Sequence, residues 1–314
     1  MNQCSVYKSE PIEIIDGIPI FEHVRDGYLR NYARIASDHI AAMSKEVDNP
    51  FIDTELWRQL EDSTRELVGR YSSPGTRVLD AGVGLGRVMA PFDTLERFGI
   101  DISLDYLSRA KAAGIDAVFA RIEDLPYKDE VFDLVIACDV LEHVIDLHKC
   151  CAEILRVLKK DGTLIIRVPY LDDLEAYLDE SIPYEFIHLR SFDVPALRLQ
   201  FEKIFGCQYV EHSFVAPYLK GAPRLKIRHL KANSKTLGIL ANIPLNGHPL
   251  SLLKRAAAVT EEEFINWIYE LKKNTPALFD QVAEDLVYGL EVNVVFKKAR
   301  TTDFSRSAPN PRGI

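Results

Sequence analysis

The sequence predicts an α/β fold in which a mostly parallel sheet of seven strands carries helices on both faces. Two features predict this fold. Short apolar runs rich in β-branched residues alternate with segments of helical periodicity, and a glycine-rich turn directly follows the first of these runs. At 314 residues, the chain is long enough for one complete domain of this class with substantial additions.

Seven segments show the strand pattern, and helical periodicity lies between them. Leu104, Leu107 and Ala110 share one face of a helix predicted after the second strand. A further helix over residues 151–158 is expected to stop before Gly162. The predicted strands are residues 77–81, 97–101, 117–120, 134–138, 163–168, 207–215 and 291–297.

The last two predicted strands are separated by about 75 residues, which is too long for a hairpin and too patterned for a loop. We therefore expect residues 217–288 to form a mainly helical insertion that serves as a lid or as a dimer surface. Residues 1–70 are predicted to form an N-terminal segment with a helical cap, and residues 71–216 the core. Residues 289–300 would supply the last core strand, and residues 301–314 a disordered tail.

Composition and charge exclude several classes of protein. With 47% hydrophobic and 27% charged residues, the chain is typical of a soluble globular protein. No run approaches the roughly 18 apolar residues of a membrane span, and the N-terminus lacks a signal-peptide pattern, so we expect a cytoplasmic protein without a membrane partner. The net charge of −9 disfavours a nucleic-acid partner. The five cysteines form no CxxC pair, so neither a disulfide framework nor a metal site is indicated.

A glycine stands at every second position from Gly82 to Gly86, directly after the first predicted strand. Glycines allow a tight turn and a close approach to a ligand, and the helix expected next would present N–H groups to it. The dehydrogenase fingerprint needs a glycine where this chain has Arg87, so a pyrophosphate ligand and an NAD-dependent oxidoreductase are disfavoured. Asp80 would repel phosphates but suits an ammonium group, and Asp101 follows where ribose hydroxyls need an acceptor.

Five motifs occur in order between residues 75 and 170. They are the glycine loop, the acidic Asp101, the segment 123–127, the fourth strand with the turn behind it at 132–144, and the approach to the fifth strand at 155–164. In this order the sequence resembles the class I S-adenosylmethionine-dependent methyltransferases, and among them the type 11-like family that acts on small molecules. The resemblance implies a Rossmann-like core and S-adenosyl-L-methionine (SAM) as cofactor.

The resemblance also implies cofactor contacts residue by residue. The methionine portion would lie against Asp80, Gly82 and Gly84, and the ribose hydroxyls would bind Asp101. Many relatives read the adenine amino group with an aspartate where this chain has Arg121, which cannot accept a hydrogen bond. Another acceptor, either Glu123 or a backbone carbonyl, must therefore replace it. The remaining expected cofactor residues are Tyr32, Ile102, Ile122, Glu123 and Cys138.

A second resemblance lies upstream, where residues 14–21 are similar to a D-G-I-P segment found ahead of many methyltransferase domains. That segment usually follows a small zinc-ribbon module, but the ribbon cysteines are missing here, so the resemblance implies no metal. The next helix, with Tyr28 and Tyr32, folds over the cofactor in relatives. Such a cover would exclude water from the transfer reaction.

Two histidines are candidates for the general base that methyl transfer to a hydroxyl needs. His143 lies in the turn behind the fourth strand, and His188 lies in the segment behind the fifth strand. Both turns open at the carboxyl edge of the sheet. Each histidine also has a structural alternative, because His143 could seat the next helix and His188 could anchor its loop. His148 is predicted to be solvated.

These observations predict a SAM-dependent methyltransferase that acts on an oxygen or nitrogen of a small-molecule acceptor, such as a natural product, a sugar, or an acidic or phosphorylated metabolite. Two alternatives stay open. A basic segment over residues 220–235 could bind RNA, which would make the acceptor a macromolecule. The fold could instead serve as a non-catalytic SAM-binding scaffold, with the insertion used for assembly or for a homodimer.

Overall fold

A computed structural model describes residues 6–22, 26–45, 49–52, 54–179, 182–219, 270, 273–277 and 287–299. The chain forms two compact units, one of residues 1–213 with 292–314 and one of residues 214–291. In the second unit, the described residues comprise parts of two strands and a few helical positions. Most of the predicted insertion, the whole basic segment and the predicted tail lie outside the described residues.

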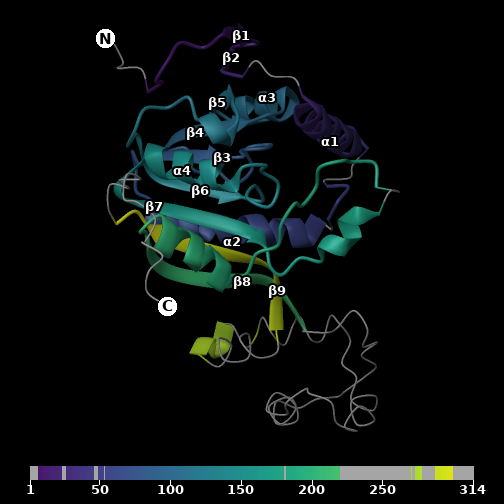
Figure 1. Cartoon of the computed structure of the whole chain (residues 1–314), viewed down its shortest axis with the longest axis vertical. Helices are drawn as coiled ribbons and strands as arrows, with labels where there is room; N and C mark the ends of the chain where they lie inside the picture. Colours follow the sequence, from purple (N-terminus) through teal and green to yellow (C-terminus); the bar gives the residue numbers. More distant parts are fainter. Residues whose placement is uncertain are drawn as a thin grey trace, which may run out of the picture. The chain divides into compact units, whose positions relative to one another are not determined.

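The sheet follows the predicted α/β arrangement, with a parallel centre whose five strands match five predicted segments (Figure 1). In spatial order these strands are β5, β4, β3, β6 and β7, and each pairs in parallel with its neighbour. Their bounds are β3 (Arg77–Ala81), β4 (Glu96–Asp101), β5 (Asp116–Phe119), β6 (Phe132–Cys138) and β7 (Leu158–Pro169).

Further strands extend the sheet at both edges. Next to β7 come β9 (Val287–Lys297) and then β8 (Gln208–Leu219), which cover the last two predicted strands. At the other edge, β2 (Ile18–Ile20) pairs in parallel with β5, and β1 (Glu13–Ile15) pairs antiparallel with β2. The described residues therefore form nine strands, which corrects the expected count of seven.

The two additional strands form a hairpin that the sequence signals at Asp16 and Gly17. Both residues have positive φ angles, 50° and 72°, as the two central positions of a type I′ turn require. Asp-Gly between short apolar runs is among the strongest sequence signals for this turn. The D-G-I-P segment thus has a direct structural role, because it folds back as β1 and β2 and extends the sheet.

The prediction of a helix directly after the glycine loop is wrong. Residues 82–92 form successive turns, with isolated bonds such as Ala90 N–H to the carbonyl of Gly86 at 2.9 Å. Three glycines disfavour a helix at its start, and Pro91 disfavours helical backbone at the residue before it. The loop therefore presents turn amides, rather than the end of a helix, to the space above the sheet.

Helices cover both faces of the sheet in the first unit. Leu67 and Val68 on one helix and Leu107 and Ala110 on another share a buried cluster with alternate strand residues such as Ile136. The opposite face is buried as well, and Figure 1 shows α4 and α2 on opposite sides of the strands. The helices are α1 (Gly27–Met43), α2 (Thr54–Tyr71), α3 (Leu104–Ala112), α4 (Leu147–Val157) and α5 (Val194–Arg198), with short 3₁₀ turns at Ile122–Asp124 and Leu174–Leu178 and a π turn at Leu199–Ile204.

The junction of α4 and β7 differs from expectation. The helix ends at Val157, and the strand begins at once with Leu158, so Gly162 lies inside a strand instead of ending a helix. Leu158 pairs with Phe132 while Thr163 pairs with Leu134, which leaves a bulge between the two registers. No helix among the described residues has the length and apolar character needed to cross a bilayer.

This topology determines where a ligand can bind. The chain crosses the sheet between β5 and β6, and β6 then pairs with β3. In an open parallel sheet, ligands bind outside the carboxyl ends of the strands at such a point of reversal. Gly82, Ile102 and Asp139 directly follow the carboxyl ends of β3, β4 and β6.

Candidate functional site

A cavity of about 660 Å³ lies over these strand ends. Its lining comes from α1, α2, the glycine loop, the ends of β4 and β6, the turn before α4 and the segment after β7. All eleven predicted site residues line it, whereas His148 is exposed and does not. The eleven residues are Tyr32, Asp80, Gly82, Gly84, Asp101, Ile102, Ile122, Glu123, Cys138, His143 and His188.

Two glycines of the loop are required for different reasons. Gly82 has φ of +109°, and a Cβ there would lie 2.2 Å from Cγ2 of Val140, so the position excludes any side chain. Gly84 has φ of +48°, but a Cβ there would meet nothing within 4 Å. Gly82 therefore serves packing, while Gly84 leaves open space at the cavity wall that a ligand can enter.

Asp101 connects the glycine loop to the end of β4. Its Oδ2 accepts the N–H of Gly84 at 3.0 Å and its Oδ1 accepts the N–H of Ser103 at 2.9 Å. Burial raises the pKa of Asp101 to about 6. The carboxylate is thus held in one orientation and keeps lone pairs for a further donor.

Asp80 is a deeply buried acidic group of the cavity wall, with only 4% of its surface exposed. Burial raises its pKa to about 7, Arg167 opposes this rise, and Asp101 and Asp139 add to it. A carboxyl in this position gains much from a cationic partner, because such a partner would favour its ionised form.

Arg121, which stands where many relatives have an aspartate, lines the cavity on the predicted adenine side. Its Nη2 lies 2.6 Å from Oδ2 of Asp26, and its Nε lies 3.2 Å from Oε2 of Glu22. Asp26 also caps α1, since its Oδ1 accepts the N–H of Leu29 at 2.9 Å. Arg121 therefore attaches the start of α1 to the core, and Glu123 remains beside it at the cavity.

Aromatic rings form a further part of the cavity wall. Tyr28 and Tyr32 from α1 lie with ring centroids 4.8 Å apart, and Tyr32 meets His143 edge-on at 5.6 Å. His143 in turn lies 4.8 Å from His188, and His188 lies 4.7 Å from Tyr177. The two predicted histidines are thus brought together although 45 positions separate them in the chain.

Each histidine uses its Nδ1 for a hydrogen bond within the protein. The Nδ1 of His143 lies 3.0 Å from the carbonyl oxygen of Ile187, which can only accept, so this nitrogen carries the proton. The Nδ1 of His188 lies 2.5 Å from Oδ2 of Asp172. Burial, together with the neighbouring His188, lowers the pKa of His143 to about 4. His143 is therefore neutral near pH 7 and keeps a lone pair on Nε2.

The segment that carries His188 is anchored by a different residue, Arg190. Its guanidinium donates to the carbonyls of Leu141 and Ile145 at 2.9 and 3.2 Å and also to that of Val144. These bonds secure the segment to the turn that carries His143. Arg190 thus anchors the segment to that turn, while His188, two residues earlier, bonds to Asp172 of the same segment.

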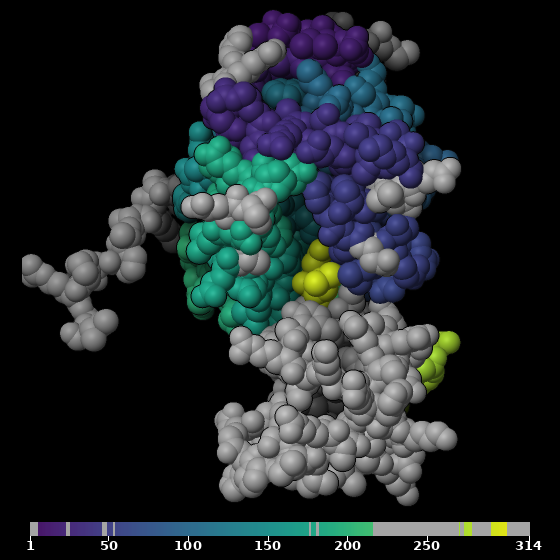
Figure 2. Space-filling view, turned by 90° about the vertical axis from the view of Figure 1, so that its right-hand side faces the viewer, coloured from purple at the N-terminus to yellow at the C-terminus, as the bar shows by residue number. Residues whose placement is uncertain are grey.

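The segment after β7 also closes onto α1, and Figure 2 shows the two in contact on one face of the molecule. Asn31 donates through Nδ2 to the carbonyl of Phe186 at 2.7 Å and accepts the N–H of Glu185 at 2.8 Å. Arg34 and Tyr184 add bonds to Pro183 and Asp38 at 2.9 Å each. We call these contacts the clasp. They join two elements that both line the cavity.

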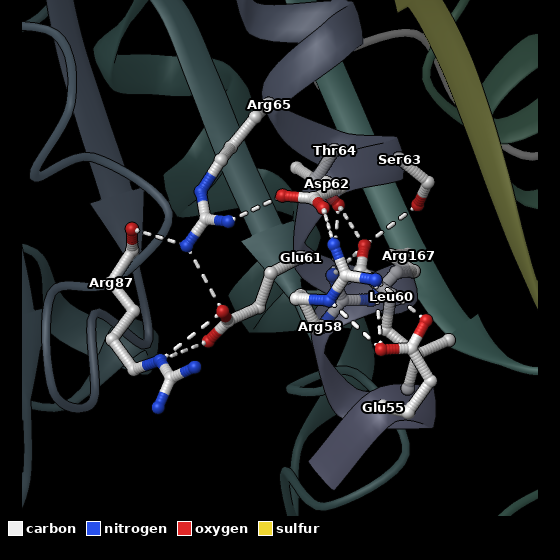
Figure 3. Close-up of polar contacts among 10 residues, drawn as sticks. All are labelled: Glu55, Arg58, Leu60, Glu61, Asp62, Ser63, Thr64, Arg65, Arg87 and Arg167. Atoms are coloured by element: carbon white, nitrogen blue, oxygen red, sulfur yellow. Dashed lines mark hydrogen bonds and ion pairs between the residues drawn. The ribbon is translucent and has the colours of Figure 1, made fainter.

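Residues of α2 contribute a polar network that sequence reasoning missed. Glu61, only 3% exposed, pairs with Nε of Arg87 at 2.9 Å and with Nη2 of Arg65 at 2.9 Å (Figure 3). The Arg87 guanidinium also lies 3.9 Å above the ring of Trp57, another cavity residue. The sequence did contain one sign of this network, which is the arginine at position 87 in place of the third glycine. A charged residue there needs a partner from outside the loop.

A second missed group is Arg167, which is 3% exposed at the end of β7. It donates to Thr64 Oγ1 and to the carbonyl of Leu60 at 2.8 Å each (Figure 3). It also pairs with Asp139 at 2.5 Å. Asp139 has φ of 54°, an uncommon angle for a residue other than glycine. The pair thus holds α2 against the strand end at which the cavity opens. Nearby Cys138 lies 3.7 Å from Thr64 Oγ1, and burial raises its pKa to about 12, so its thiol stays protonated.

Together these residues fit a cofactor with a cationic amino-acid end and a ribose. Gly84 leaves room for close approach, Asp80 gains from a positive charge, and the fixed Asp101 can accept hydroxyl protons. The aromatic end with its two imidazoles is suited to position a second molecule and to accept a proton. We call the part of the cavity with Asp80, Gly84 and Asp101 the donor end and the part with the two imidazoles the acceptor end.

Comparison with known proteins agrees with this arrangement. Residues 79–166 match the family described as "Methyltransferase domain". An uncharacterized protein of Methanocaldococcus jannaschii is 37% identical over 125 residues, which cover 40% of this chain and 58% of that protein. An O-methyltransferase of Aspergillus nomiae is 32% identical over 137 residues, covering 40% of this chain and 61% of that enzyme.

A solved structure shows the same fold. It is a chain from the complex between the Haloferax volcanii Trm112 methyltransferase activator and the putative methyltransferase, with a TM-score of 0.50 and 18% identity over 88% of this chain and 100% of that one. The chain spans less than two thirds of the length of the two curated relatives named above. The matched region nevertheless contains the end of β3, the glycine loop, Asp101 and His143. Over residues 79–166, the chain therefore contains a methyltransferase domain.

Proposed function

We propose that this chain transfers the methyl group of SAM to an oxygen or nitrogen of a small molecule. One observation supports the proposal above all others: the buried carboxyl of Asp80, the half-buried carboxyl of Asp101 and two imidazoles line a single cavity at the carboxyl edge of the sheet. The carboxyls suit the donor, and the imidazoles suit a nucleophilic acceptor that loses a proton.

The proposed roles follow from the contacts. Asp80 with the backbone at Gly82 and Gly84 binds the amino-acid end of the cofactor, and Asp101 binds the ribose hydroxyls. Ile102, Ile122 and Glu123 surround the adenine. When bound, SAM supplies a methyl group activated by its positive sulfonium.

His143 is the proposed general base. Its Nδ1–H is bound by the carbonyl of Ile187, so Nε2 is the atom that accepts the proton of the acceptor. A neutral imidazole is required for this step, and burial keeps His143 neutral. Asp172 orients the ring of His188 beside it.

The small-molecule class is supported by the enclosure of the acceptor end. The clasp joins α1 to the segment after β7 across elements that line the cavity. Tyrosine rings from both elements face the same space, which favours a compact, partly apolar acceptor and excludes water during transfer. An RNA acceptor would depend on basic residues that lie outside the described part of the chain.

Isothermal titration with S-adenosylhomocysteine (SAH), followed by a transfer assay with methyl-labelled SAM, tests the proposal. The acceptor pool is split into a small-metabolite fraction and an RNA fraction. We expect SAH to bind and label to appear in the small-metabolite fraction. Label confined to RNA would replace the small-molecule acceptor by a macromolecule, and SAH binding without any transfer would favour a scaffold. Absence of SAH binding would exclude the proposed cofactor, and binding of NADH instead would point to an oxidoreductase.

A further inference from the structure

Glu142, His143 and His188 form a cluster that the proposed transfer uses only in part. One ligand-type atom from each residue lies within 4.8 Å of the others, and Nε2 of His143 lies 3.8 Å from Oε1 of Glu142. We propose that this cluster binds a divalent transition-metal cation, such as Zn²⁺, Co²⁺, Fe²⁺ or Mn²⁺. Two imidazoles with one carboxylate suit these ions better than Mg²⁺ or Ca²⁺, which prefer all-oxygen ligands.

The hydrogen bonds behind the two imidazoles carry most of this inference. A histidine that binds a metal through Nε2 almost always donates its Nδ1–H to a backbone carbonyl or a carboxylate, which orients the ring. His143 has the first arrangement, toward Ile187 at 3.0 Å, and His188 has the second, toward Asp172 at 2.5 Å. Both rings therefore hold their Nε2 lone pairs available, and the ring centroids lie only 4.8 Å apart.

Glu142 supplies the third ligand and the negative charge. Its side chain is 1% exposed, and its Oε1 lies 3.8 Å from Nε2 of His143. A tetrahedral ion with bonds of about 2.1 Å holds its ligand atoms about 3.4 Å apart, so modest side-chain rotations would close the present separations onto an ion.

The position of the cluster suggests what the ion would do. His143 and His188 both line the cavity, so open coordination positions of the ion would face an acceptor bound there. An ion there would bind an acceptor oxygen and lower the pKa of its hydroxyl, so that the proton leaves to solvent before the O–CH₃ bond forms and the S–CH₃ bond breaks. This role rests on the proposed methyl transfer, whereas the binding site itself does not. The Nε2 of His143 would then bind the ion instead of accepting the proton.

Titration with Co²⁺ tests the site, because bound Co²⁺ has a visible absorption that reports its ligands. The full chain is used free of any affinity tag and after treatment with a chelator. We expect one Co²⁺ per chain with micromolar or tighter affinity, displacement by Zn²⁺, and no displacement by Mg²⁺ in large excess. Absence of saturable binding, or preference for Mg²⁺ over Co²⁺, would overturn the proposal.

Variants locate the ion. His188→Ala and Glu142→Gln should each weaken Co²⁺ binding at least 100-fold, and Asp172→Asn should weaken it about 10- to 100-fold through the orientation of His188. His148→Ala is the matched control, since this exposed histidine is outside the cavity, and it should bind as the original protein does. Co²⁺ binding by His188→Ala at the original affinity would overturn the assignment.

SAH titration of each variant separates the two proposals and checks the fold. We expect the affinity for SAH to change less than threefold in His188→Ala. This variant still tests the metal site if Glu142→Gln, which changes a buried residue, does not fold. SAH binding without Co²⁺ binding would overturn the metal site alone. Co²⁺ binding without SAH binding would overturn the proposed cofactor while leaving the metal site in place.

Discussion

The two ends of the cavity are built in different ways. At the donor end, the key groups follow directly from strands β3 and β4, and Asp101 and Gly84 are joined by a bond between segments only 17 residues apart. At the acceptor end, α1 and the segment after β7 meet through bonds such as that between Asn31 and Phe186, 155 residues apart. The donor end depends on backbone conformation, whereas the acceptor end depends on side chains from distant elements.

This difference separates what the fold provides from what the individual chain provides. Any parallel sheet with this order places the ends of β3 and β4 side by side, so the donor end comes with the fold. The acceptor end depends on which side chains the cap and the segment after β7 carry. Changes at the donor end should therefore affect folding and cofactor binding, and changes at the acceptor end should leave both largely intact.

The largest effect is expected from Gly82→Ala. Its Cβ would lie 2.2 Å from Val140 Cγ2 on backbone with φ of +109°, so we expect a loss of roughly 3 kcal/mol in the free energy of unfolding. Gly84→Ala is the matched control, because its Cβ meets nothing and only the φ of +48° is unfavourable, which costs about 1 kcal/mol. Urea unfolding measures both.

SAH titration completes this comparison. Gly84→Ala should fold but bind SAH at least tenfold more weakly, because its Cβ takes space at the cavity wall. Equal stability of the two variants would contradict the packing role of Gly82. Unchanged SAH binding by Gly84→Ala would remove Gly84 from the donor end.

The next largest effect concerns the charge at Asp80. Asp80→Asn keeps the shape but removes the charge, and we expect SAH to bind about 10- to 150-fold more weakly, the range for a lost hydrogen bond to a charged group of 1.5–3 kcal/mol. Asp105→Asn is the control, since Asp105 is acidic and exposed on α3. An equal loss in both variants would mean that overall charge, and not this site, attracts the cofactor.

The pKa of Asp80 gives this interaction a pH dependence of defined sign. Burial raises it to about 7, Arg167 opposes the rise, and Asp101 and Asp139 add to it. An ammonium group needs the ionised carboxylate, so SAH binding should weaken below pH 7, by up to about tenfold for each further unit. Titrations between pH 6 and 8 measure this, and Asp80→Asn should show a flatter profile.

Stability should change in the opposite direction. The pKa of Asp80 in the folded protein lies above its ordinary value of 3.8, so the folded state favours the protonated form. The contribution of this group to the free energy of unfolding is complete below about pH 4 and is lost as the pH rises through about 7. Urea unfolding of the ligand-free protein and of Asp80→Asn should therefore diverge with rising pH, with the variant more stable at pH 8. A profile that rises with pH in both proteins would contradict the raised pKa.

The same contrast explains how much the sequence could predict. The five central strands were predictable, and the eleven predicted site residues all line the cavity, because strand patterns are local and parallel order aligns the strand ends. A helix after Gly86 was predicted from the general behaviour of glycine loops, and this was wrong. Pro91 in the sequence already disfavoured a helix there. The hairpin at Asp16 was missed for the reverse reason, since its Asp-Gly signal was interpreted only by resemblance.

The acceptor end was less predictable for a physical reason. Asn31 bonds to the backbone at residues 185 and 186. These bonds form only when the complete fold brings the two distant segments together, and no local sequence pattern encodes that. The burial of Glu142 and the contact between Trp57 and Arg87 have the same origin. Their residue types were visible in the sequence, but their partners were not.

The smallest effect is expected from opening the clasp. Asn31→Ala removes a side chain that is 8% exposed and that both donates to Phe186 and accepts from Glu185. Losing these bonds costs about 1–2 kcal/mol, so the backbone N–H of Glu185 should exchange with deuterium about 5- to 30-fold faster. Ser37→Ala, an exposed position on the same helix, is the control. SAH affinity should change less than threefold, because Asn31 does not contact the donor end. A large loss of SAH affinity would instead show that closure over the acceptor and binding of the donor are one event, and the two ends of the cavity would then have to be treated as a single site.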